Sequence, residues 1–168
     1  IDRSAKIIDV GGGDSTLVDF LLEQCFENIT VLDISAKALE KAKARLGDRA
    51  QLVTWIVSDI TQFQPETTYD VWHDRAVFHF LTEEEQIEKY LNIARKAAVG
   101  YLTIGTFSEN GPEKCSGLAI KQYTEDTMSS VFASDFETLT TKRENHITPF
   151  GTEQNFVFCS FQRNTLKN

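Results

Sequence analysis

The chain has 168 residues, of which 41% are hydrophobic and 25% charged, an ordinary balance for one globular domain. Its formal net charge of −8 argues against sequence-independent binding to nucleic acid, and no apolar run approaches the roughly 20 residues that span a membrane. Three scattered cysteines without CxxC spacing argue against a disulfide framework or a metal site and favour a reducing cytoplasm. We therefore expect a cytoplasmic protein of a single domain, residues 1–168, and an upstream segment that is missing before Ile1.

Short apolar runs alternate with helical patterns through the first two-thirds of the chain. The sequence predicts strands at 6–10, 29–33, 51–58, 69–74 and 99–106, and helices at 15–25, 36–46 and 82–97. Ser35 is the expected N-cap of the second helix, and Gly47 ends it. Strands that alternate with helices predict a parallel sheet with both faces covered.

The tail of the chain has a different pattern. Residues 136–143 and 155–163 are predicted strands, joined through a turn at Pro149-Phe150-Gly151 without an intervening helix. This pattern predicts an antiparallel hairpin at one edge of the sheet. The long segment 107–122 before the tail is expected to be a lid or binding loop, in which no partner base marks Cys115 as a nucleophile.

A glycine-rich turn follows the first predicted strand. Asp9 and Val10 lead into Gly11, Gly12 and Gly13, and a helix follows from about residue 15. Glycines at this place let the backbone turn sharply and approach a ligand closely, and ligands of open α/β sheets bind at the carboxyl ends of the strands. The alternative is a turn without a ligand.

The residues around this turn argue against two common nucleotide sites. Thr16 and Leu17 stand where a phosphate-binding loop needs Gly and Lys, and Thr16 also replaces the third glycine of a dinucleotide fingerprint. Asp9 would repel a pyrophosphate and would instead suit an amino group.

Single acids follow the second and third strands. Asp33 lies 22 residues after Gly11, where a carboxylate can accept hydrogen bonds from both hydroxyls of a ribose. Asp59 follows the third strand, where a carboxylate can accept from an adenine amino group. Alone, each acid would more often be a helix cap or a solvated loop residue, and the prediction of a cofactor site depends on the set.

Together these motifs resemble the class I S-adenosylmethionine-dependent methyltransferases from Ile7 to about Thr106. Residues 9–13 resemble the acid-x-Gly-x-Gly motif of that family, with Ser15 in place of the usual third glycine. Residues 31–35 resemble its ribose motif, so Ile34 becomes a further candidate for cofactor binding. Residues 58–60 resemble its adenine motif, so Ile60 becomes another. The resemblance implies a three-layer Rossmann-like α/β sandwich with a seven-stranded, mostly parallel sheet and S-adenosylmethionine as cofactor.

A second resemblance is to a branch of the family that includes protein-lysine methyltransferases, and it rests on Gly-x-Gly-Asp-Ser-Thr-Leu, Asp59-Ile60-Thr61 and Asp74-Arg75-Ala76. Asp14, Arg75 and Ala76 depart from the pattern of that branch, so bacterial small-molecule methyltransferases match at least as well. The acceptor is therefore expected to be a small molecule or a protein side chain.

The fourth predicted strand ends in three ionisable residues, which is unusual for a buried parallel strand. We expect His73, Asp74 and Arg75 to line the pocket, with Asp74 and Arg75 beside the methyl group; an Asp74–Arg75 ion pair is the alternative. His79 is a further candidate base, because histidine titrates near neutral pH, although a hydrogen bond at a helix start is the more common role for such a residue. His146 is expected to be a loop or edge residue.

The expected function is methyl transfer from S-adenosylmethionine. Asp74 and His79 are the catalytic candidates, and the cofactor candidates are Asp9, Gly11, Gly12, Gly13, Ser15, Asp33, Ile34, Asp59, Ile60, Asp74 and Arg75. Two alternatives are a cofactor-binding scaffold or regulatory subunit without turnover and, less favoured, an NAD-linked oxidoreductase.

Overall fold

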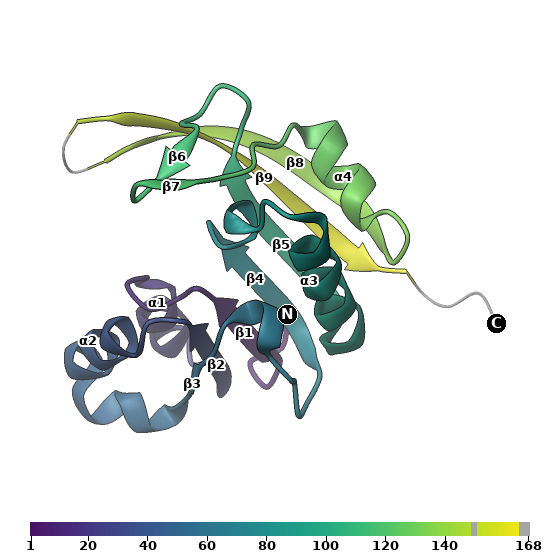
Figure 1. The fold of residues 1–168 in the computed structure, drawn as a ribbon. Helices are drawn as coiled ribbons and strands as arrows, with labels where there is room; N and C mark the ends of the chain where they lie inside the picture. Colours follow the sequence, from purple (N-terminus) through teal and green to yellow (C-terminus); the bar gives the residue numbers. More distant parts are fainter. Residues whose placement is uncertain (149–150, 165–168) are drawn as a thin grey trace.

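A seven-stranded sheet forms the centre of the molecule in the computed structural model, which describes residues 1–148 and 151–164 (Figure 1). Its strands are β1 (Lys6–Val10), β2 (Asn28–Asp33), β3 (Val53–Val57), β4 (Tyr69–Arg75), β5 (Ala98–Phe107), β8 (Phe136–Ile147) and β9 (Glu153–Arg163). They lie in the order β3-β2-β1-β4-β5-β9-β8. The strands β1 to β5 are parallel, and β9 is antiparallel to both of its neighbours. The predicted sheet and its antiparallel hairpin are confirmed.

Helices cover both faces of the sheet. The helical segments are α1 (Leu17–Glu23), α2 (Ala36–Leu46), α3 (Glu84–Ala97), α4 (Glu125–Phe132) and the short 3₁₀ turns η1 (Gly47–Leu52), η2 (Ile60–Gln62) and η3 (Phe78–Phe80). A two-stranded ribbon, β6 (Lys114–Cys115) with β7 (Leu118–Ala119), lies within the predicted binding loop. Among the described residues, no helix is long and apolar enough to cross a membrane.

Two apolar cores lie on opposite faces because side chains alternate along each strand. Ile7 of β1 packs with α1 and α2, whereas its neighbour Ile8 packs with α3 and α4. Trp72 of β4 is completely buried on the side of Ile8. The result is the predicted three-layer α/β sandwich.

Several boundaries differ from the predictions for local reasons. The first helix begins at Leu17 because the Ser15 hydroxyl accepts from the Leu17 N–H at 3.0 Å and occupies a turn of its own. The third strand begins at Val53 because residues 47–52 form η1. The predictions for α2 are confirmed, since Ser35 Oγ accepts from Ala38 N at 3.2 Å and Gly47 adopts φ +59° at the end of the helix.

The terminal hairpin is longer than predicted. The ladder between β8 and β9 continues to the pair Ile147–Glu153, through polar residues that carry no apolar alternation. Of the predicted turn, Pro149 and Phe150 lie outside the described residues. The hairpin therefore extends past the carboxyl end of β5, as Figure 1 shows.

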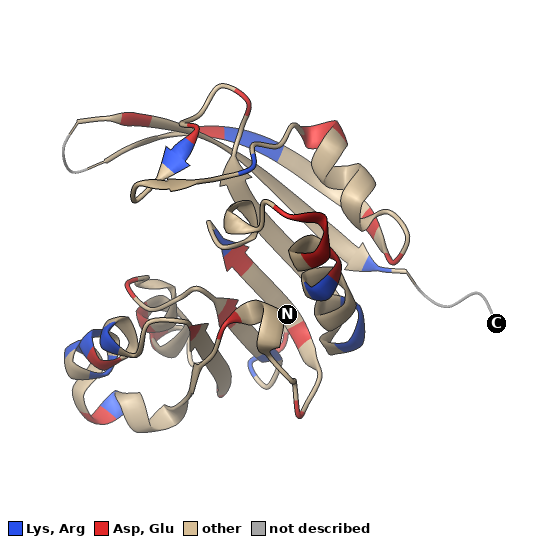
Figure 2. Cartoon of the chain, viewed as in Figure 1, with Lys and Arg blue, Asp and Glu red and all other residues tan. Residues whose placement is uncertain are grey.

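Charged residues of both signs are mixed over the fold. In the view of Figure 2, basic residues are interspersed with acids along α2 and follow the acidic first turn of α3. Acids at the start and bases at the end of α3 complement its dipole.

Candidate functional site

Two joined cavities lie at the carboxyl ends of the parallel strands, the edge where open α/β sheets bind ligands. The first has a volume of about 830 Å³ and lies between the ends of β2, β3 and β4 and the β6–β7 ribbon. The second has a volume of about 600 Å³ and lies over the ends of β1, β4, β5 and β9 on the side of α1. Residues that line both cavities are Gly11, Asp14, Arg75, Ala76 and Cys115.

The glycine turn lies between the two cavities, and its own packing demands glycine. Gly11 has φ +74°, and a Cβ there would lie 2.1 Å from Val77 Cγ2. A Cβ on Gly12 would lie 2.3 Å from Asp9 Oδ2. Gly11 lines both cavities, whereas Gly12 is buried and lines neither of them. The turn therefore brings backbone to the cavity wall at a place where side chains do not fit.

Asp33, at the end of β2, connects this turn to α2. Its carboxylate accepts from Gly13 N at 3.0 Å and from Ser35 N at 2.7 Å. It lines the first cavity beside Ile34, whose side chain is 71% exposed. Each carboxylate oxygen keeps further acceptor capacity, so Asp33 can still receive hydroxyl groups of a ligand.

Asp59 and Ile60 line the first cavity directly after β3, the strand that pairs with β2 beside Asp33. Asp59 is the N-cap of η2, and its Oδ1 accepts from both Thr61 N and Thr61 Oγ1 at 2.8 Å. Since Oδ1 makes both of these bonds, Oδ2 remains available to accept from an amino group. The helix-cap role and the predicted ligand role are therefore compatible.

Asp9 occupies the floor of the second cavity. It is 2% exposed, its Oδ1 lies 2.8 Å from His73 Nδ1, and among the described residues its buried Oδ2 has no hydrogen-bond partner. An unpartnered buried carboxylate oxygen is costly, and a cationic group of a ligand would satisfy it. Two predicted site residues in the described part of the chain have a buried polar atom without a partner, Asp9 Oδ2 and His79 Nε2, and of the two only Asp9 lines a cavity.

Aromatic rings form the far wall of the second cavity. Phe107 at the end of β5 and Phe156 on β9 meet edge to face, with ring centroids 4.8 Å apart. The guanidinium of Arg75 lies 5.6 Å from the centroid of the Phe156 ring. His146 and Gln154, a cross-strand pair of the β8–β9 hairpin, complete this wall.

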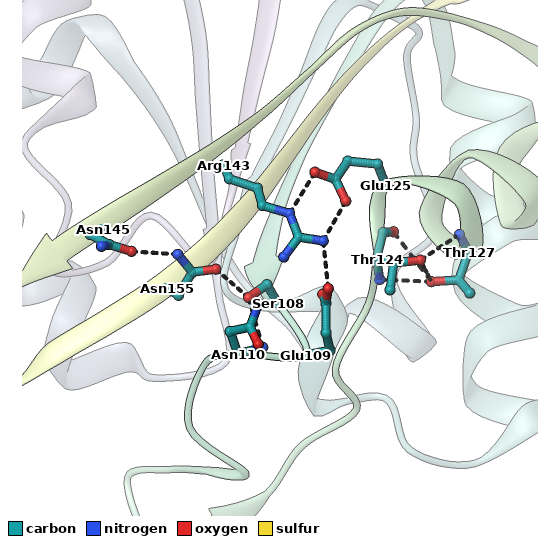
Figure 3. Close-up of polar contacts among 9 residues, drawn as sticks. All are labelled: Ser108, Glu109, Asn110, Thr124, Glu125, Thr127, Arg143, Asn145 and Asn155. Atoms are coloured by element: carbon teal, nitrogen blue, oxygen red, sulfur yellow. Dashed lines mark hydrogen bonds and ion pairs between the residues drawn. The ribbon is translucent and has the colours of Figure 1, made fainter.

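A polar cluster fixes the hairpin beside β5 (Figure 3). Arg143 on β8 binds both carboxylate oxygens of Glu125 at 2.6 Å and Glu109 at 2.6 Å. The Asn155 side chain hydrogen-bonds to the Ser108 hydroxyl directly after β5. This cluster holds Phe156 in register with Phe107 and so determines the shape of the second cavity.

Residues 8–99 match the family model described as a methyltransferase domain, and they make up more than half of the chain. The chain belongs to this methyltransferase domain family.

Individual relatives support the assignment. Malonyl-[acyl-carrier protein] O-methyltransferase from Anoxybacillus flavithermus is 32% identical over 125 residues, 71% of this chain and 47% of the relative. Malonyl-[acyl-carrier protein] O-methyltransferase 1 from Ilyobacter polytropus is 33% identical over 91 residues, 53% of this chain and 33% of the relative. The chain therefore spans at most about half the length of these curated relatives.

A solved structure shares the fold of this methyltransferase domain. The N-methyltransferase NodS from Bradyrhizobium japonicum, in complex with S-adenosyl-L-homocysteine, superposes with a TM-score of 0.77 at 16% identity. The match covers 96% of this chain and 80% of NodS.

Asp74 lies outside both cavities of the methyltransferase domain, so the prediction that it lines the pocket is wrong. Side chains alternate along β4, and Asp74 therefore points away from His73 and Arg75 toward α3. It is completely buried, accepting from Val77 N at 2.9 Å and from the Tyr90 hydroxyl at 2.7 Å. Burial raises its pKa from 3.8 to about 6. The alternative ion pair with Arg75 is not formed either, and the geometry supports a structural role.

His79 also lies outside both cavities. It is completely buried in η3 between the rings of Phe80 and Phe107, and its Nδ1 accepts from Phe107 N at 3.4 Å. Burial lowers its pKa to about 4, so the ring is neutral at physiological pH. These contacts favour the structural explanation over the catalytic one.

The structure brings most of the other predicted residues to the cavities and adds some that were missed. Asp33, Ile34, Asp59 and Ile60 line the first cavity, Asp9 and Ser15 the second, and Gly11 and Arg75 both. Gly13, like Gly12, supports the turn without lining a cavity. Lining residues for which sequence reasoning gave no site role include His146, Gln154 and Phe156, whereas Phe107 begins the segment predicted to be a lid or binding loop. The alternation of apolar and polar residues in β9 was visible in the sequence. The sequence did not show that β9 pairs with β5, and this pairing brings Phe156 to the cavity.

Proposed function

We propose that the chain transfers the methyl group of S-adenosylmethionine to a small-molecule or protein-side-chain acceptor. The observation that carries this proposal is the pair of joined cavities, with the unpartnered Asp9 oxygen beneath the glycine turn. The first cavity suits the adenosine part of the cofactor, and the floor of the second suits the methionine part. The remaining space of the second cavity is left for the acceptor.

The donor set fits the charges and hydroxyls of this cofactor. Asp9 would receive the amino group, Asp33 the ribose hydroxyls and Asp59 the adenine amino group. Gly11, Ile34 and Ile60 would make van der Waals contacts with the adenosine. Arg75, which lines both cavities, would lie beside the methyl group. When bound, the sulfonium supplies an electrophilic methyl group, so the protein has mainly to align the acceptor with it.

Relatives support the same conclusion. NodS holds S-adenosyl-L-homocysteine, the product of this cofactor, and the two sequence relatives described above are named as O-methyltransferases. An NAD-linked oxidoreductase is disfavoured because Asp9 would lie against the pyrophosphate. We also propose that the chain acts in the cytoplasm, which the scattered cysteines favour.

Calorimetric titration with S-adenosylhomocysteine, with NAD as the control, tests the cofactor assignment. We expect saturable one-to-one binding of S-adenosylhomocysteine and none of NAD. Binding of NAD alone would overturn the proposal. Turnover of an acceptor would separate an enzyme from a scaffold that binds the cofactor without catalysis.

Asp33→Ala tests the ribose contact in the same titration. Each lost hydrogen bond to a charged acceptor costs about 1.5–3 kcal/mol, so we expect affinity to fall by about tenfold to a hundredfold. Asp48→Ala is the matched control, because Asp48 is exposed in η1 and lines neither cavity. Unchanged affinity of the Asp33 variant would contradict the assignment.

A further inference from the structure

The second cavity contains an acid–imidazole pair whose chemistry the cofactor does not require. Asp9 and His73 are register partners on the adjacent strands β1 and β4. Asp9 Oδ1 lies 2.8 Å from His73 Nδ1, and the Asp9 side chain is 2% exposed whereas that of His73 is 24% exposed. The carboxylate is therefore enclosed behind the ring, and the ring lines the cavity.

The hydrogen of this bond belongs to the imidazole. A carboxylate can only accept, so Nδ1 of His73 donates to Asp9 and, in the neutral ring, Nε2 keeps its lone pair. Within residues 1–148 and 151–164, no side chain or backbone group hydrogen-bonds to Nε2. A carboxylate that fixes the ring in this tautomer is the arrangement found behind a general base.

The two carboxylate oxygens of Asp9 have different surroundings, so one can hold His73 while the other is left for a cofactor amino group. Oδ1 holds His73, while the buried Oδ2 lies beneath Gly12 without a partner. Gly12 covers Oδ2, so a cofactor amino group would reach this atom only after a shift of the turn, and its binding there would leave the bond between Oδ1 and His73 in place. The two functions share one side chain and do not compete for the same atom.

The need for a base indicates the kind of acceptor. A carboxylate is ionised at neutral pH and a thiol ionises readily, whereas an alkyl ammonium and a phenolic hydroxyl both keep a proton to about pH 10. Of these two, the ammonium is charged and the phenol is neutral. The rings of Phe107 and Phe156 form an apolar wall suited to a flat group. A hydroxyl on a flat ring therefore fits both the base and the wall.

We propose that His73 is the base that accepts the acceptor's proton, that Asp9 is its positioning residue, and that the second cavity takes a hydroxyl group on a flat apolar ring. This inference rests on the proposed function. The hydroxyl proton moves to His73 Nε2, and the oxygen electron pair forms the bond to the methyl carbon. The pair of the broken carbon–sulfur bond stays on sulfur, and the imidazolium then releases its proton to water.

Other charged and titratable groups face the same cavity. Arg75 follows His73 by two residues on the same face of β4 and supplies positive charge for the developing oxyanion. Asp14 lies at the exposed rim, and His146 and Cys115 line the opposite side. His73 is distinguished from His146 by its buried carboxylate partner.

The first experiment determines the tautomer of His73 in the full chain. Long-range ¹H–¹⁵N correlation at pH 8 reports which ring nitrogen carries the proton, and His73→Gln assigns the signal among the three histidines. We expect protonated Nδ1 and unprotonated Nε2. Asp9→Asn should abolish this preference, while Asp14→Asn, the matched control, should preserve it. A proton on Nε2 would overturn the proposal.

The second experiment probes the cavity with phenol, using toluene as the control without a hydroxyl. With S-adenosylhomocysteine bound, phenol should shift the His73 Nε2 resonance toward the protonated position in a saturable way. Toluene should bind without this shift, and Asp9→Asn should remove the response to phenol. An absent shift, or an equal shift with toluene, would refute the assignment of the base.

Failure of this inference can be told apart from failure of the proposed function. Absence of S-adenosylhomocysteine binding in the calorimeter would overturn the cofactor proposal. The tautomer of His73 in the free chain tests the acid–imidazole pair without any cofactor. Binding of S-adenosylhomocysteine together with an unresponsive His73 would leave the methyltransferase assignment intact and overturn only the base.

Discussion

Asp74→Asn isolates the cost of burying one charge in this fold. Asp74 is completely buried, and burial raises its pKa from 3.8 to about 6, although hydrogen bonds from Tyr90, Val77 and Phe78 oppose the rise. A difference of this size corresponds to about 3 kcal/mol between the protonation states. The folded chain holds the Asp74 proton up to about pH 6, and the unfolded chain releases it near pH 4. The free energy of unfolding therefore falls as pH rises between these values and is level above them.

The amide variant removes this titration while keeping the shape of the side chain. Urea unfolding of both proteins from pH 4 to pH 7.5 gives the difference in free energy of unfolding at each pH. Relative to Asp74→Asn, we expect the wild-type chain to lose about 3 kcal/mol across this interval. Shifts of the other carboxylates cancel in the difference, and the exposed Asp48→Asn checks for an effect of the amide substitution itself.

The result also decides between the two roles considered for Asp74. A difference that stays constant with pH, or that grows in favour of the wild-type chain, would refute the argument from burial. Because Asp74 lines neither cavity, the amide variant should bind S-adenosylhomocysteine with wild-type affinity in the calorimeter. A large loss of affinity would instead support the original prediction that Asp74 contacts the cofactor.

Three further predictions concern the turn, the ribbon and the hairpin. Gly12→Ala forces a Cβ against Asp9 Oδ2 and should lower the free energy of unfolding in urea by about 1–3 kcal/mol and weaken S-adenosylhomocysteine binding in the calorimeter. Gly47→Ala, which has no atom within 4 Å but a φ of +59°, should lower the free energy of unfolding and leave the affinity unchanged. In a Cys25→Ser background, iodoacetamide should label Cys115, which lines both cavities, and the labelled protein should bind the cofactor more weakly. Mass spectrometry should find Cys159 unlabelled, because burial raises the pKa of its thiol to about 11. Arg143→Gln should lower the urea midpoint at low salt and less so at 1 M NaCl, since Arg143 holds the pKa of Glu125 at about 2 through a screened surface contact; equal losses at both salt concentrations would contradict an electrostatic cause.

Local signals in the sequence were sufficient for most of the fold. The strand 6–10 and the helix 36–46 are as predicted, because an apolar run, an N-cap at Ser35 and a glycine at position 47 act within a few residues. The glycine turn and Asp33 were recognisable for the same reason. Each depends on its place at the end of a strand, which the order of elements fixes.

The tertiary structure decided which side chains share a cavity. His73, Asp74 and Arg75 are consecutive, and the sequence placed all three in the pocket, but the phase of alternation along β4 sends Asp74 to the opposite core. Asp9 and His73 lie 64 residues apart, and only the parallel pairing of β1 with β4 brings them together.

The register in which the hairpin pairs with β5 was the other feature that could not be predicted from the sequence alone. Phe156 faces Phe107 because β9 pairs antiparallel with β5 in one register, and a slip by one residue would turn the ring to the other face of the sheet. Arg143 and Asn155 hold that register through contacts with residues far away in the sequence. The sequence by itself thus determined the elements and the edge of the sheet at which the cavities lie, and long-range strand pairing determined the lining of the second cavity.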